Sequence, residues 1–209
     1  MATLGSLDWA LFHSVNAGVA ARDWLEDPTT ALAALAVPVY ALATVALWFV
    51  ARPYRSIRWK AACVSALVAA GIGLVANQAI AQVWARPRPS VSHASSTHLL
   101  AAPSPDPSFP SDHAAAAFAI AFAILAFSRP AGLGFLGAAT LIGLSRIALG
   151  LHYPSDVLAG LVVGFAAATV VVLVGRSWIE RVVALVSRVS DPLLKPVWDR
   201  LGSLSPVRR

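Results

Sequence analysis

Residues 145–156 read Ser-Arg-Ile-Ala-Leu-Gly-Leu-His-Tyr-Pro-Ser-Asp and join two apolar runs of the chain. The stretch carries Arg146, His152 and Asp156, side chains that are costly near hydrocarbon and whose default interpretation there is functional. A histidine can act as a nucleophile, an aspartate can orient it, and an arginine can bind an anion through a planar fork of donors. Together the three residues indicate phosphoryl chemistry.

The composition is that of an integral membrane protein. Of the 209 residues, 58% are hydrophobic and 12% are charged, and the mean hydropathy is +0.71. A soluble domain usually carries roughly 25% charged residues. The net charge of +6 comes without a basic patch interleaved with aromatic residues, so we expect no nucleic-acid partner. Cys63 is the only cysteine and lies in an apolar run, which excludes a disulfide framework and a cysteine-based metal site.

Five apolar segments predict an all-α bundle in a single domain of residues 1–209. Each has the roughly 18–25 residues that a helix needs to cross a bilayer. They are residues 31–51, 60–84, 111–128, 131–149 and 157–175. The loop at residues 90–110 is long and polar, which is typical of a lid or a binding loop.

Two further segments flank this five-helix catalytic bundle of residues 31–175. Residues 7–21 are too short and too polar to span a bilayer, so we expect an interfacial helix with His13 on its polar face. Residues 177–209 alternate apolar and basic side chains and predict an amphipathic tail that rests on anionic lipid.

The charges at the ends of the predicted helices are asymmetric. If the five helices alternate, one face receives 12 basic and three acidic residues, including the whole tail, and the other receives four basic and seven acidic residues. The positive-inside rule makes the first face cytoplasmic. The C-terminus is then cytoplasmic, and residues 145–156 face outward.

Two more clusters of polar residues belong to the outward face. The second helix ends at Arg86-Pro87-Arg88-Pro89, where the prolines stop the helix and leave two guanidinium groups at its rim. The third helix begins with Ser111 as its expected N-cap, and its first turn, with His113, offers unpaired N–H groups to an anion. The topology predicts one site made of Arg86, Arg88, Ser111, His113, Arg146, His152 and Asp156.

These residues resemble the three signatures of the type 2 phosphatidic acid phosphatase (PAP2) superfamily. The signatures are Arg88-Pro89, then Pro110-Ser111-Asp112-His113, then Arg146 with five residues to His152 and three more to Asp156. The resemblance spans about residues 60–175 and implies a six-helix core that hydrolyses phosphate esters or anhydrides without a metal or other cofactor. It implies that His152 forms a phosphohistidine, that Asp156 orients His152, and that His113 is the general acid. It also implies that Arg88, Arg146 and Ser111 hold the phosphoryl oxygens.

The chain departs from the superfamily pattern at two positions. Ala81 stands where the first signature opens with a lysine, so we expect Arg86 or Gln82 to take its place. Asp112 stands where most members have glycine, and we expect its carboxylate to favour the helix dipole and to pair with Arg86. The resulting Ser-Asp-His sequence and the polar loop before it, which carries His93 and His98, are similar to the bacitracin-resistance type of undecaprenyl-diphosphatase.

The sequence therefore predicts an outward-facing polyprenyl diphosphate phosphatase of a bacterial cytoplasmic membrane. Its lipid substrate is undecaprenyl or decaprenyl diphosphate, and its product is the monophosphate, the recycled carrier of peptidoglycan synthesis. Two alternatives stay open: a broader phosphatidic acid or phosphatidylglycerophosphate phosphatase, and a non-catalytic lipid-phosphate binder that the missing lysine would suit. Retention of both histidines and Asp156 argues against the binder. A soluble vanadate-type haloperoxidase shares the signatures, but the hydrophobicity excludes it.

Overall fold

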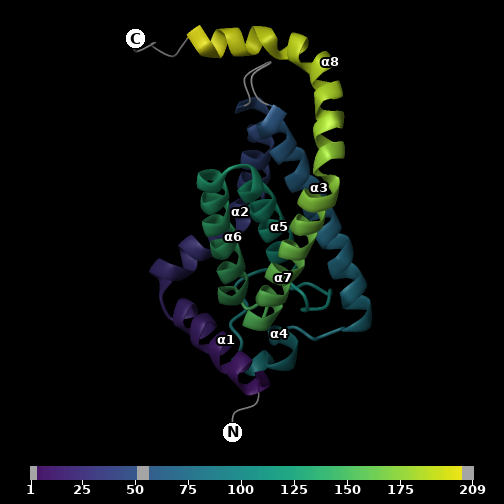
Figure 1. Cartoon of the computed structure of the whole chain (residues 1–209). Coiled ribbons are helices and arrows are strands. Elements are labelled where there is room, and N and C mark those ends of the chain that lie inside the picture. The colour runs from purple at the N-terminus through teal and green to yellow at the C-terminus, as the bar shows by residue number, and fades with distance from the viewer. Residues whose placement is uncertain (1–3, 51–56, 204–209) are drawn as a thin grey trace.

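The protein is a bundle of helices in the computed structural model, which describes residues 4–50 and 57–203 (Figure 1). No strand occurs in these two ranges, which confirms the predicted all-α class. In chain order the elements are α1 (Leu4–Ala20), α2 (Asp23–Val50), α3 (Ile57–Val83), α4 (Pro89–Ser92), the 3-10 turn η1 (Ala94–Ser96), α5 (Asp112–Phe127), α6 (Arg129–Ala148), α7 (Pro154–Val170), the π-helical turn η2 (Val171–Gly175) and α8 (Arg176–Ser203).

Helix α5 is the centre of the bundle and packs against α3, α6 and α7. Its sequence is apolar all round, and most of its side chains are buried, as expected for a helix enclosed by others. Two glycines of α7 allow a very close approach: a Cβ at Gly160 would lie 2.7 Å from the Ser111 carbonyl oxygen, and one at Gly164 would lie 2.6 Å from that of Ala115. This contact sets the start of α5 directly against the middle of α7.

Four stretches of the described helices are long and apolar enough to cross a membrane. They are Asp23–Phe49, Ile57–Val83, Arg129–Ala148 and the continuous stretch Pro154–Pro196. The fifth predicted segment, residues 111–128, corresponds to α5, whose 16 residues extend only about 24 Å. A bilayer core is about 30 Å thick. The chain is therefore a multi-pass membrane protein, but the described helices supply four candidate spans where the sequence predicted five.

Helix α7 continues through η2 into α8 without a break, so the helix does not end at residue 175 as the sequence predicted. The first part of α8 packs along α3, with Val183 buried. Lys60 at the start of α3 forms an ion pair with Asp191 and donates to Ser187 Oγ at 3.1 Å. Most of the other large apolar side chains of α8 stay exposed, among them Val182, Leu185 and Val186, and the last part of α8 turns across the bundle (Figure 1).

Helix α1 packs on the opposite end of the bundle from the end of α8 (Figure 1). Its Asn16 is fully buried and donates to the carbonyl oxygens of His98, at 2.7 Å, and Ala148, at 2.8 Å. The His98 N–H donates back to Asn16 Oδ1 at 2.9 Å. His13 is exposed, as predicted. The predicted N-terminal helix is thus present, and it fixes both the loop after α4 and the end of α6.

Candidate active site

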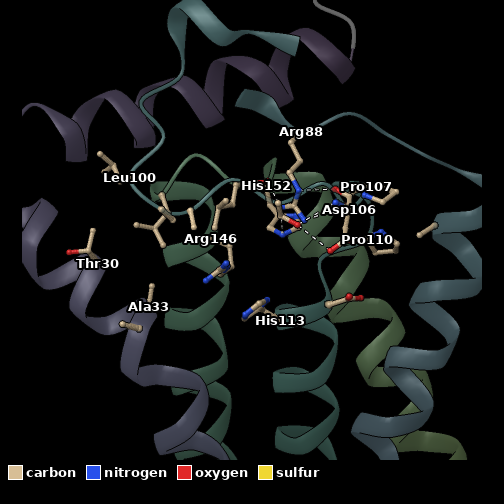
Figure 2. A pocket seen from close by; sticks show the side chains of 18 of the residues that line it. Thr30, Ala33, Arg88, Leu100, Asp106, Pro107, Pro110, His113, Arg146 and His152 are labelled. Atoms are coloured by element: carbon tan, nitrogen blue, oxygen red, sulfur yellow. Dashed lines mark hydrogen bonds between the residues drawn. The ribbon is translucent and has the colours of Figure 1, made fainter. Parts of the chain in front are cut away.

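A cavity of about 470 Å³ opens at the end of the bundle where α5 begins and α6 ends (Figure 2). Four of the seven predicted site residues line it: Arg88, His113, Arg146 and His152. Figure 2 shows Arg146 and His113 facing each other from α6 and α5, with His152 and Arg88 above them. The predicted convergence of three separate sequence signatures is therefore seen for these four side chains.

His152 follows a sharp turn between α6 and α7. Gly150 has φ of 80°, and a Cβ there would lie 2.7 Å from the His98 carbonyl oxygen, so glycine is required for this turn. The His152 ring is buried, with Nδ1 2.7 Å from the Ser108 carbonyl oxygen and Nε2 3.2 Å from Arg88 Nη1. Because a carbonyl can only accept, Nδ1 carries the proton, and in the neutral ring Nε2 keeps its lone pair. That tautomer suits a nucleophile.

Asp156 lies behind His152 and is fully buried. Its Oδ2 is 3.8 Å from His152 Nδ1 and instead accepts from Ser108 Oγ at 2.5 Å and from the Tyr153 N–H at 2.8 Å. Asp156 therefore holds Ser108, and the carbonyl of Ser108 holds the imidazole. The sequence interpretation missed Ser108, whose role is played by a backbone oxygen that leaves no residue signature.

Arg88 is fixed by backbone carbonyls at the rim of α3. Its Nε donates to the Asp106 carbonyl oxygen at 2.9 Å and its Nη1 to that of Leu151 at 3.1 Å. Burial lowers the pKa of Arg88 from its ordinary value, while the nearby carboxylates, Asp106 first, act in the opposite direction. The pKa of an arginine lies so far above neutral pH that the side chain keeps its charge even when it is partly buried. Arg88 therefore presents a fixed cation to the cavity.

Arg146 presents a guanidinium group that is only partly satisfied. Its Nε is buried and has no hydrogen-bond partner among the residues that the structure describes. Buried donors are nearly always paired, and guanidinium groups bind phosphate oxygens well. An anion in the cavity would satisfy this group.

The first turn of α5 brings His113 and Asp112 to the cavity but turns Ser111 inward. Ser111 is the N-cap, as predicted, and its Oγ accepts from the Ala114 N–H at 3.5 Å. Its side chain is fully buried, and it is absent from the residues that line the cavity. In this structure Ser111 shapes the start of α5 rather than the wall of the cavity.

Arg86 does not lie where the sequence interpretation put it. Its Nη1 donates to Asp156 Oδ1 at 2.8 Å and its Nη2 to Asp8 Oδ2 at 2.7 Å, and the guanidinium stacks on the Tyr153 ring at 3.8 Å. Arg86 is not part of the cavity lining. Two carboxylates bind this cation in the structure, and the expectation that Arg86 binds phosphate in place of the missing lysine stays a prediction.

The second departure, Asp112, also has partners other than those expected. Asp112 accepts from Asn77 Nδ2 at 2.9 Å and from Gln78 Nε2 at 3.0 Å, and it does not pair with Arg86. Ala81 and Gln78 line the cavity, whereas Gln82 is exposed and does not. Ala81, which stands where the superfamily has a lysine, therefore faces the cavity and contributes no positive charge to it.

The loop before α5 lines the cavity, and its role as a lid or a binding loop stays a prediction. Its contributions include Leu100, Asp106 and Pro107. It is held from outside by α1, because the His93 ring stacks on Trp9 with 3.8 Å between ring centroids. Within the described ranges, no group of three or more histidine, cysteine or carboxylate side chains is arranged to hold a metal ion.

The family model and the relatives that match this chain point to the same protein family. Residues 59–179 match the family model of the PAP2 superfamily. The chain is 32% identical over 157 residues to undecaprenyl-diphosphatase BcrC of Bacillus subtilis strain 168, covering 75% of this chain and 78% of that protein. It is 28% identical over 162 residues to the putative undecaprenyl-diphosphatase YbjG of Escherichia coli K12, covering 77% of this chain and 79% of that protein.

Two crystal structures share the fold. LpxE of Aquifex aeolicus superposes with a TM-score of 0.63 at 25% identity, covering 78% of this chain and 93% of that chain. The PAP2-type phosphatidylglycerolphosphate phosphatase of Bacillus subtilis superposes with a TM-score of 0.56 at 22% identity, covering 78% of this chain and 83% of that chain.

Proposed function

Since the chain belongs to the PAP2 superfamily, we propose that it is a lipid phosphatase that converts polyprenyl diphosphate to the monophosphate and inorganic phosphate. The substrate is undecaprenyl or decaprenyl diphosphate, and the reaction recycles the lipid carrier of peptidoglycan synthesis. The two relatives named as undecaprenyl-diphosphatases, each matched over about three quarters of this chain, support this choice.

One observation carries the proposal: the imidazole of His152 is held through Nδ1, and Nε2 lies in a cavity with two arginines. Nε2 attacks the terminal phosphorus atom, and the bond from phosphorus to the bridging oxygen breaks. Burial and the nearby cations lower the pKa of His113 to about 4 in the free site, and the negative charge of the bound diphosphate raises it again so that His113 is protonated. His113 then gives this proton to that oxygen, and the lipid monophosphate leaves. Water then attacks the phosphohistidine while His113 takes a proton, which releases phosphate and restores His152.

The two arginines supply the charge that the transferring group requires. A phosphoryl group passes through a loose transition state whose charge lies on its non-bridging oxygens, so positioning and neutralisation are the main requirements. Arg88 is fixed beside Nε2, and Arg146 has an unpaired buried donor. These two cations perform the neutralisation, and the proposed reaction therefore proceeds without a metal ion.

A second, almost wholly apolar cavity of about 230 Å³ supports a lipid substrate. It lies between α2, α3, α5 and α6, with Val37, Leu74 and Ile120 in its walls, and it shares Asp112 and His113 with the phosphate cavity. A prenyl chain attached to a phosphate at His113 can leave the site through this cavity toward the bilayer.

The site faces the outside of the bacterial cytoplasmic membrane in this proposal, and the C-terminus is cytoplasmic. The charge asymmetry of the sequence supports this orientation. Arg58 and Arg129, at the starts of α3 and α6, belong to the end of the bundle away from the cavity, where Arg58 donates to the Phe127 carbonyl oxygen.

Phosphate release by the detergent-purified protein tests the function. Undecaprenyl diphosphate and phosphatidic acid are compared in EDTA, with His152→Ala as the control. We expect turnover of the diphosphate that survives EDTA, is lost in His152→Ala and is weak on phosphatidic acid. Turnover of phosphatidic acid alone would contradict the substrate, and turnover that requires an added divalent metal would contradict the mechanism.

A further inference from the structure

Asp8 of α1 is joined to the catalytic residues through Arg86. Arg86 donates from Nη2 to Asp8 Oδ2 at 2.7 Å and from Nη1 to Asp156 Oδ1 at 2.8 Å. One planar guanidinium thus bridges two carboxylates that come from helices far apart in the sequence. Neither Asp8 nor Arg86 lines the phosphate cavity, so the bridge supports the catalytic residues from behind.

Asp8 also binds the first turn of α7 directly. The Ser155 N–H donates to Asp8 Oδ1 at 2.9 Å, and the Ser155 hydroxyl donates to Oδ2 at 2.5 Å. Ser155 is the second residue of α7, so its N–H is one of the donors that a helix leaves without an internal partner. Asp8 therefore positions Asp156 twice, through its backbone by way of Ser155 and through its carboxylate by way of Arg86.

Arg86 and the two carboxylates, Asp8 and Asp156, stabilise one another's charged forms. Asp156 is fully buried, and the side chains of Asp8 and Arg86 are 10% and 24% exposed. Burial acts to lower the pKa of Arg86, but hydrogen bonds and charge interactions with Asp8 and Asp156 outweigh it and raise that pKa. Buried charges keep a fixed geometry only while each remains paired.

The chain of contacts ends at the nucleophile. Arg86 holds Asp156, Asp156 accepts from Ser108 Oγ, and the Ser108 carbonyl accepts from His152 Nδ1. A small rotation of the imidazole would move Nε2 away from the line of attack. A displacement of about 1 Å at a reacting atom can cost on the order of 100-fold in rate.

We propose that Asp8 is a positioning residue for His152 that acts through Arg86 and Asp156, which makes α1 part of the catalytic apparatus. This inference rests on the proposed function, because it assigns Asp8 to the same phosphoryl transfer. Asp8 has no contact with the cavity, so it affects kcat and leaves KM unchanged.

Kinetics of Asp8→Asn on undecaprenyl diphosphate test the inference, with Asp23→Asn as the matched control. Asp23 is an exposed aspartate in the first turn of α2. Asp23→Asn therefore makes the same chemical change away from Asp8, Arg86 and Asp156. Asp8→Asn keeps an oxygen for the Ser155 N–H but loses the charge that Arg86 requires. We expect kcat to fall about tenfold with KM unchanged, Asp8→Glu to recover part of the loss, and Asp23→Asn to match the wild type.

A double-mutant cycle with Arg86→Gln separates positioning from partial misfolding. A misfolded fraction would lower the rate by the same factor in both backgrounds, whereas an effect through Arg86 should largely vanish in Arg86→Gln. The inference would be overturned if Asp8→Asn lowered the rate by equal factors in the wild-type and Arg86→Gln backgrounds. It would also be overturned if the wild type were active and Asp8→Asn had the same kinetics as Asp23→Asn. Either result would leave the proposed function standing. A wild-type protein without turnover on any lipid phosphate would overturn the proposed function and the Asp8 assignment with it.

Discussion

The two ends of the bundle each hold a cation that is at least partly buried, Lys60 of α3 and Arg146 of α6, but the two cations differ in how far their donors are satisfied. At the α8 end, Lys60 contacts Asp191 and Ser187, and its ammonium group lies 5.2 Å from the centroid of the Trp48 ring. At the cavity end, Arg146 keeps a buried Nε without a partner among the described residues. A cation with complete contacts serves the fold, and one with a spare donor is available to a ligand.

The largest effect is expected from His152→Ala at the cavity end. The substitution removes the nucleophile, and we expect phosphate release to fall by about 10³-fold or more. The ring makes few contacts beyond Ser108 and Arg88, so the melting temperature should stay close to that of the wild type. A His152→Ala protein that keeps more than a tenth of the wild-type rate would remove this residue from the mechanism.

The next effect concerns the unsatisfied cation itself. Arg146→Lys keeps a positive charge but loses the forked donors, and we expect the rate to fall about 100-fold with the melting temperature preserved. Phosphate release and a thermal unfolding curve measure the two quantities. A large drop in stability with near-normal turnover would mean that Arg146 serves the fold as Lys60 does, and the comparison of the two ends would fail.

The converse is expected at the α8 end. Lys60→Met removes the Lys60 ammonium group from the buried Asp191 carboxylate, which should cost about 3–5 kcal/mol of unfolding free energy. Turnover per folded molecule should be unchanged, because Lys60 is remote from the cavity. The double variant Lys60→Met with Asp191→Leu should recover most of the stability, and a failure to recover would contradict the assignment of the loss to the buried charge of Asp191.

The smallest effect tests the missing lysine. Ala81 lines the cavity, so Ala81→Lys should add a cation near the bound phosphate and lower KM about threefold, which corresponds to a weak, partly screened charge interaction. Ala85→Lys is the matched control, since Ala85 is exposed and outside the cavity. Equal KM values in the two variants would show that position 81 does not reach the substrate.

Much of the cavity could be predicted from the sequence, because charged residues in an apolar chain leave few places where they can lie. The three signatures identified Arg88, His113, Arg146 and His152, and the structure brings these four together. The roles of Ser108 and Arg86 could not be predicted in the same way. Ser108 acts through a backbone oxygen, and Arg86 pairs with Asp8, across 78 positions of the chain, as well as with Asp156.

The prediction of the helix boundaries was limited for a different reason. Hydropathy cannot separate a helix enclosed by protein from one that faces lipid, so the prediction of five spanning segments depends on α5, which has 16 residues and is shorter than the four other candidates. Hydropathy also shows where the sequence becomes polar, which need not be where the helix ends. For that reason the continuation of α7 through η2 into α8 was missed.

The most direct test of the central claim is to trap the phosphorylated enzyme. The protein is mixed with undecaprenyl diphosphate labelled in its terminal phosphate, quenched in alkali, digested and sequenced by mass spectrometry, with His113→Ala and His152→Ala beside it. The account predicts an acid-labile phosphoryl group on His152 that forms in the wild type, forms more slowly in His113→Ala and is absent from His152→Ala. Turnover without label on His152, or label on another residue, would contradict it.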